Sequence, residues 1–130
     1  MKTLTLRTRP KHIQDIVSGH RDCEIREIRP QTSQKYIEYF DKSDPSKAYK
    51  TYDEVPDEVE IDVRPLKYDA LRLIADDGNI LVRIKDIEIY IVVEEDKAGN
   101  TFALTYHYKG KEYVTTHIHY YLGEIIESNV

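Results

Sequence analysis

Residues 11–29, KHIQDIVSGHRDCEIREIR, hold the pattern that decides the fold of this chain. Within residues 13–17 the apolar side chains recur at the i, i+3, i+4 spacing of a short amphipathic helix, and Gly19 supplies a helix stop. Residues 22–28 then alternate with the period of two that is typical of a strand. The stretch therefore predicts a two-turn helix that ends at a glycine and leads directly into a charged strand.

The two faces of the strand predicted over residues 22–28 differ in chemistry. Cys23 and Ile25 share one face, which we expect to turn inward, and Glu24 and Arg26 share the other. Because opposite charges on one face can pair, the carboxylate is expected to hold the arginine fork outward. The inward cysteine is expected to be a buried, inert thiol.

The remaining N-terminal segments predict one more strand, one more helix and a loop. Residues 3–9 alternate as a half-buried strand, and residues 31–40 fit a second short helix. Residues 41–57 are polar, contain two prolines and show no period, so we expect a long loop. Such a loop is either a mobile insertion or a substrate lid, and the sequence leaves both open.

Strand patterns dominate from residue 58 onward. Strands are predicted over residues 58–64, 80–93, 101–108 and 111–121, with 122–126 as a continuation, while 68–75 fits a strand or a helix. The apolar phase of the longest strand shifts near Lys85, which predicts a β-bulge of the kind a small closed barrel needs. Early helices and late strands together predict an α+β fold with a mainly antiparallel, barrel-like sheet, in a single domain over residues 1–130.

Composition and charge limit the classes of protein to consider. The chain has 130 residues, 40% hydrophobic and 33% charged, and no apolar run approaches the ~18 residues of a membrane span. Its N-terminus lacks the apolar core of a signal peptide, and a single cysteine excludes an internal disulfide, so we expect a cytoplasmic protein. The eleven tyrosines are expected mainly on half-buried strand surfaces.

The charge is unevenly distributed along the chain. Residues 1–29 carry seven lysines and arginines against four acids, a net +3, whereas the remainder carries twelve against twenty, a net −8. The overall charge of −5 disfavours indiscriminate binding to phosphate backbones. Any anion site is therefore expected on the N-terminal segment.

Residues 19–26, GHRDCEIR, fit the pattern G-x-[KR]-x-x-E-x-R and resemble the signature of the ASCH family. The resemblance covers residues 4–29 and, more loosely, the strand-rich remainder. It implies a PUA-like β-barrel with one or two short helices near the N-terminus, and a cleft beside the motif that binds RNA or a nucleotide-like ligand. The ligand-binding residues that it implies are Arg21, Glu24 and Arg26, with Arg7, Arg9 and Lys11 nearby.

Some members of the ASCH family look like small amidohydrolases acting on acylated cytidine. They use a lysine where this chain has Arg21 and a threonine where it has Glu24. Because arginine stays protonated in proteins, it is a poor base or nucleophile, and this departure weighs against catalysis. The alternative of a hydrolase or nuclease acting on a nucleoside or RNA would use Glu24 as the base, Arg21 to stabilise an oxyanion, and His20 as a further acid–base candidate.

Two other classes of function are weighed against ligand binding. His117 and His119 share a strand face and His107 is a conceivable third metal ligand, but no carboxylate completes the set. We therefore predict no metal and no cofactor. A non-catalytic module that binds a protein partner through the acidic portion or the tyrosine-rich sheet is the third alternative, and the oligomeric state is left open.

Overall fold

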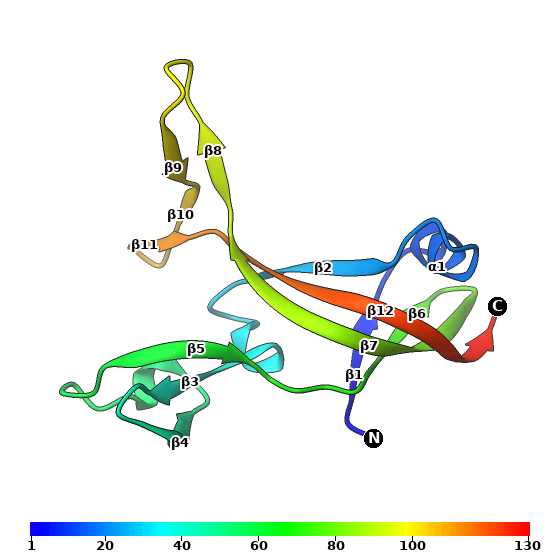
Figure 1. Ribbon diagram of the computed structural model, residues 1–130, viewed down its shortest axis with the longest axis horizontal. Helices are drawn as coiled ribbons and strands as arrows, with labels where there is room; N and C mark the ends of the chain where they lie inside the picture. Colours follow the sequence, from blue (N-terminus) through cyan, green and yellow to red (C-terminus); the bar gives the residue numbers. More distant parts are fainter. The chain divides into compact units, whose positions relative to one another are not determined.

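The computed structural model describes all 130 residues as an α+β fold in which strands predominate (Figure 1). It has one α-helix, α1 (Pro10–Val17), and two short 3-10 helices, η1 (Ser33–Lys35) and η2 (Tyr52–Glu54). The strands are β1 (Thr3–Arg7), β2 (Cys23–Ile28), β3 (Ile37–Asp41), β4 (Asp44–Tyr49), β5 (Ile61–Pro65), β6 (Ala70–Ala75), β7 (Gly78–Ile91), β8 (Val93–Glu95), β9 (Thr101–Ala103), β10 (Thr105–Tyr108), β11 (Lys111–Val114) and β12 (Thr116–Asn129). The predicted α+β class is confirmed.

The largest sheet has five strands in the order β1-β6-β7-β12-β2. β1 pairs with β6 in parallel, with Leu4 opposite Leu71, and β6 pairs with β7 as an antiparallel hairpin. β1 and β2 are the two edges of this order, joined in sequence by α1, and they do not pair with each other. The sheet is consequently open, and the predicted PUA-like barrel is not confirmed.

The chain divides into two compact units. The first comprises residues 1–24, 67–87 and 119–130, and the second comprises residues 25–66 and 88–118. The first unit contains β1, α1 and β6, and the second contains β3, β4, β5 and the hairpins β8–β9 and β10–β11. β2, β7 and β12 each have residues in both units.

The core of the first unit follows the predicted patterns of β1 and α1. Leu4 and Leu6 are buried on one side of β1, and Ile13 and Ile16 are buried on α1. Burying a side chain of this size stabilises the fold by about 1.5–3 kcal/mol, so the apolar stripe holds a helix too short to persist alone. Val17 departs from the prediction, since it is 45% exposed.

The prediction for the faces of β2 is wrong. Glu24 is only 2% exposed, whereas Ile25 is 42% exposed. A period of two shows which residues share a face but not which face turns inward. Ile28 lies an even number of residues from Glu24, so both side chains are on the same face of β2. That face is the buried one, and it includes the carboxylate as well as the isoleucine.

Two predictions for the second unit also need correction. The helix expected over residues 31–40 is replaced by η1 and β3, and the loop expected over residues 41–57 contains β4 and η2. β3 lies between β4 and β5, and this pairing on both sides overrides the local helical pattern. Pro45 is tolerated in β4 because β4 is an edge strand.

The segments Lys97-Ala98-Gly99-Asn100 and Lys109-Gly110, whose composition predicts turns, do form the turns of two hairpins. β8 and β9 form an antiparallel hairpin, and β10 and β11 form another around Lys109 and Gly110. Both turn residues have positive φ, 51° and 78°, as a two-residue type I′ turn requires. The strands expected over residues 101–108 and 111–121 are interrupted at Leu104 and Thr115, which join each other by a 2.7 Å backbone hydrogen bond.

Gly78, the first residue of β7, lies against the C-terminal end of the chain. A Cβ there would sit 2.3 Å from the backbone oxygen of Asn129. We expect Gly78→Ala to lower the free energy of unfolding by about 1–3 kcal/mol, because backbone must move to admit the methyl group. Gly123→Ala is the matched control, since its tightest contact is the flexible Lys85 side chain at 3.1 Å. Thermal unfolding measures both, and equal losses would contradict the close approach.

Candidate functional site

The G-x-[KR]-x-x-E-x-R motif lies at the turn from α1 into β2. Gly19 has a φ of +82°, the left-handed conformation that ends the helix. The Arg21 backbone N–H donates to the Asp15 carbonyl at 3.0 Å, and its side-chain Nε donates to the Cys23 carbonyl at 3.0 Å. The half-buried Arg21 side chain is thus held against the first residue of β2.

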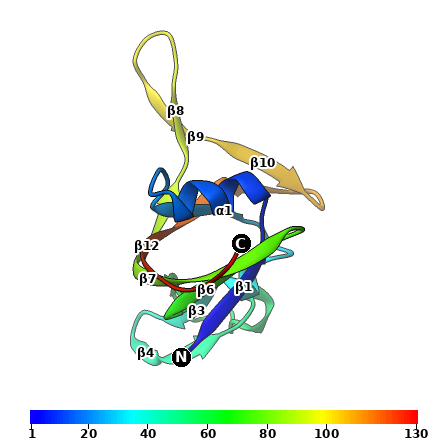
Figure 2. The same cartoon turned by 90° about the vertical axis from the view of Figure 1, so that its right-hand side faces the viewer.

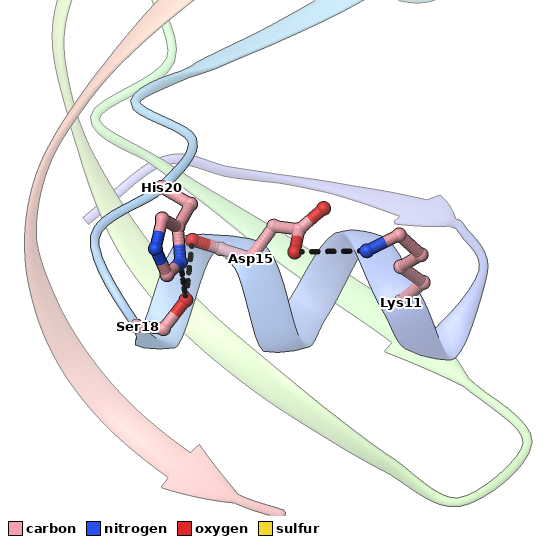
Figure 3. A network of polar contacts seen from close by, with 4 residues as sticks. All are labelled: Lys11, Asp15, Ser18 and His20. Carbon is pink, nitrogen blue, oxygen red and sulfur yellow. Dashed lines mark hydrogen bonds and ion pairs between the residues drawn. The ribbon is translucent and has the colours of Figure 1, made fainter.

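A small polar network surrounds this turn (Figure 3). Lys11 Nζ pairs with Asp15 Oδ1 at 3.4 Å, Ser18 Oγ donates to the Asp15 carbonyl at 3.2 Å, and Ser18 Oγ lies 2.7 Å from His20 Nδ1. All of these hydrogen bonds are exposed, so each adds ~0–1 kcal/mol and can be exchanged for a ligand. His20, the acid–base candidate, is therefore bonded to a serine.

The predicted site residues are placed in both units. Arg7, Arg9, Lys11, His20, Arg21 and Glu24 belong to the first unit, and Arg26 belongs to the second. Arg7 forms an exposed ion pair with Asp76 at 3.0 Å, and Arg9 is exposed at the N-cap of α1. Glu24 is buried, so its carboxylate does not face solvent as a ligand contact or a catalytic base would.

A cavity of about 310 Å³ lies along α1 in the first unit. Ile13 and Val17 of the helix contribute to its wall together with the C-terminal Val130, which lies beside α1 (Figure 2). From the turn between α1 and β2, only Ser18 lines this cavity. None of the predicted ligand-binding residues lines this cavity.

The second unit contains a larger cavity, of about 700 Å³. Its distinctive feature is a set of four tyrosines from four elements: Tyr39 of β3, Tyr52 of η2, Tyr106 of β10 and Tyr113 of β11. We call this cavity the tyrosine pocket. Its volume lies in the range of about 300–1,000 Å³ that is typical of small-molecule sites.

The tyrosines form two pairs. Tyr106 and Tyr113 are opposite each other in the β10–β11 hairpin, and their rings stack with centroids 5.7 Å apart and planes 20° apart. Tyr39 and Tyr52 meet edge to face, with centroids 6.0 Å apart and planes at 73°. The Tyr52 side chain is 66% exposed, so one of these aromatic surfaces is open to a ligand.

Charged groups at the tyrosine pocket include two cations and one acid. The Arg29 guanidinium lies 4.2 Å from the centre of the Tyr106 ring and pairs with Glu27 at 3.0 Å. Lys111 is exposed and makes no ion pair, and Asp53 is the acid. Because Glu27 already pairs with Arg29, Lys111 is the cation of the lining that is available to an anionic ligand.

Two hydroxyl groups of the pocket, those of Tyr39 and Tyr106, are held in their neutral form. Burial raises the pKa of Tyr39, and the neighbouring Tyr113, Tyr52 and Tyr106 raise it further. Burial likewise raises the pKa of Tyr106, although Arg29 acts in the opposite direction. Near neutral pH these phenols are protonated and can both donate and accept hydrogen bonds.

The sequence-based reasoning missed the tyrosine pocket. Its residues are scattered between positions 28 and 116, so no local motif contains them. One signal was available: a two-residue turn at Lys109 and Gly110 places Tyr106 and Tyr113 opposite each other in the hairpin. Tyr39 and Tyr52 lie on β3 and η2, two elements that the sequence did not predict.

Other kinds of site are not found. No group of three or more His, Cys, Asp and Glu side chains is arranged to hold a metal ion, and His107, His117 and His119 do not form one. The single α-helix is far too short to cross a membrane.

Comparison with protein-family models, with curated proteins and with solved structures finds no match, and the resemblance to the ASCH family therefore stays a prediction.

Cys23 provides a test of the environment of the motif strand. Burial is the main cause that raises the pKa of its thiol; Asp22 and Glu24 act in the same direction, and Arg21 opposes them. Because the thiolate is the reactive form, we expect slow alkylation at about pH 8 that accelerates as the pH rises. Asp22→Asn should lower the pKa and increase the rate, which mass spectrometry of the iodoacetamide adduct measures. A rate equal to that of the urea-unfolded chain would contradict the partial burial of Cys23.

Proposed function

We propose that this protein binds RNA or a nucleotide-like ligand, with the base held in the tyrosine pocket. The observation that carries the proposal is the combination of four tyrosines and two cations around a cavity of about 700 Å³. A PUA-like relationship is part of the same proposal, supported by the order strand, short helix, glycine and charged strand over residues 3–28.

Nucleotide chemistry matches the groups that the pocket offers. Bases stack on aromatic rings, and each such contact contributes about 1–3 kcal/mol with little dependence on sequence. Arg29 and Lys111 can contact phosphate oxygens, while neutral tyrosine hydroxyls can bond to the polar edge of a base. The guanidinium over Tyr106 also extends the stacking surface, since bases stack on arginine planes as well as on rings.

The pocket adjoins the motif strand in sequence. β2 carries the motif and ends at Ile28, and both Ile28 and Arg29 line the pocket. Arg21, Glu24 and Arg26 remain a separate proposal, as the ligand contacts that the family resemblance implies. The burial of Glu24 makes Arg21 the better probe of that region.

The test is a chemical-shift titration of ¹⁵N-labelled protein with 5′-mononucleotides and with single-stranded RNA of about eight nucleotides. We expect Tyr52→Ala to weaken binding by about 5- to 150-fold, the equivalent of one lost stacking contact. Because Tyr52 is largely exposed, its truncation should leave the fold intact. Tyr49→Ala, a tyrosine of β4 outside the pocket, is the matched control.

Other outcomes of this titration would overturn parts of the proposal. Binding that survives Tyr52→Ala but is lost in Arg21→Ala would move the site from the pocket to the motif. Spectra that do not change with any nucleotide or RNA would reject the function itself.

A further inference from the structure

We infer that the tyrosine pocket holds a single mononucleotide, with its phosphate on Lys111, in preference to a segment of a longer RNA strand. The inference rests on the proposed function, since it specifies which nucleotide-like ligand the pocket takes. It follows from three features of the second unit: the walls of the pocket, the charge around it and the position of its cations.

The pocket is a cavity walled by many elements. Its lining comes from β2, η1, β3, η2, β5, β7, β10, β11 and β12, and every lining residue belongs to the second unit. A protein that follows a nucleic-acid strand instead uses a positively charged groove along which successive bases stack. A cavity of about 700 Å³ with walls from nine elements suits a ligand of small-molecule size.

The charge of the second unit opposes a polyanion. Its residues carry ten lysines and arginines against fifteen acids, a net −5. Residues 53–62, DEVPDEVEID, hold six of these acids and no lysine or arginine, and they begin at Asp53 in the pocket wall. Every additional phosphate of a strand would meet this repulsion, whereas strand binding depends on clustered cations that release counterions.

The two cations of the pocket, Arg29 and Lys111, differ in whether they are available to a ligand. Arg29 is already engaged by Glu27 and by the face of Tyr106, so it forms part of the stacking wall. Lys111, at the start of β11, has an exposed side chain without an ion pair and is free to take the phosphate. One available cation matches one phosphate group.

Calorimetry with three ligand types tests the inference: the 5′-mononucleotides, the matching nucleosides, and RNA of about eight nucleotides, each at about 50 and 200 mM salt. We expect at least one mononucleotide to bind about tenfold more tightly than its nucleoside, as one charge-assisted contact allows. RNA should bind no more tightly per site than that mononucleotide.

Lysine variants of the β10–β11 hairpin locate the phosphate. Lys111→Gln should abolish the difference between nucleotide and nucleoside. Lys109→Gln should preserve that difference, because Lys109 lies over the Tyr108 ring, outside the pocket. The two variants remove the same charge from one hairpin, so a general electrostatic effect would change both equally and overturn the assignment.

The remaining outcomes separate this inference from the proposed function. RNA that binds more than about tenfold tighter than every mononucleotide, with a steep salt dependence, would overturn the inference and leave RNA binding in place. Equal binding of nucleotide and nucleoside to the unaltered protein would overturn the phosphate site. No binding of any of the three ligand types would reject both proposals.

Discussion

The register of the β10–β11 hairpin is the constraint on which the chemistry of the second unit depends. Lys109 and Gly110 adopt positive φ, and the resulting two-residue turn sets Tyr106 opposite Tyr113. Since side chains alternate along a strand, a slip of one residue would place the two rings on opposite faces of the hairpin. The stacked pair and the guanidinium of Arg29 over Tyr106 would then be lost together.

A second constraint is the alternation of side chains along β2, the strand that carries the motif, because it decides which of them are buried. Glu24 and Ile28 lie on the same face, and the burial of the isoleucine accompanies that of a carboxylate which would be better solvated outside. Buried charged groups of this kind are uncommon in proteins and need compensation from their surroundings. The motif therefore contributes to the interior of the protein as well as to its surface, and substitutions of Glu24 would affect folding before they revealed a role in binding.

The sequence predicted the parts of the fold that depend on neighbours in the chain. β1, α1 and the turn at Lys109 follow from alternation, helical spacing and turn residues, all of which act over a few positions. β3 and β4 did not follow, because β4 depends on pairing with β3, and β3 depends on pairing with β5, about twenty residues further on. The tyrosine pocket was missed for the same reason, since its walls meet only after that pairing has formed.

Charge shows most clearly how folding alters a conclusion drawn from the linear sequence. The net +3 of residues 1–29 predicted an anion site there, yet the first unit as folded carries nine lysines and arginines against nine acids. Acids from distant segments supply the balance, as Asp76 does for Arg7. The second unit is acidic overall but keeps Arg29 and Lys111 at one aromatic cavity. A small anionic ligand responds to the charges that line its site, whereas a long polyanion responds to the charge of the whole surface. The cations at the pocket and the net negative charge of the second unit therefore favour a single mononucleotide over an RNA strand.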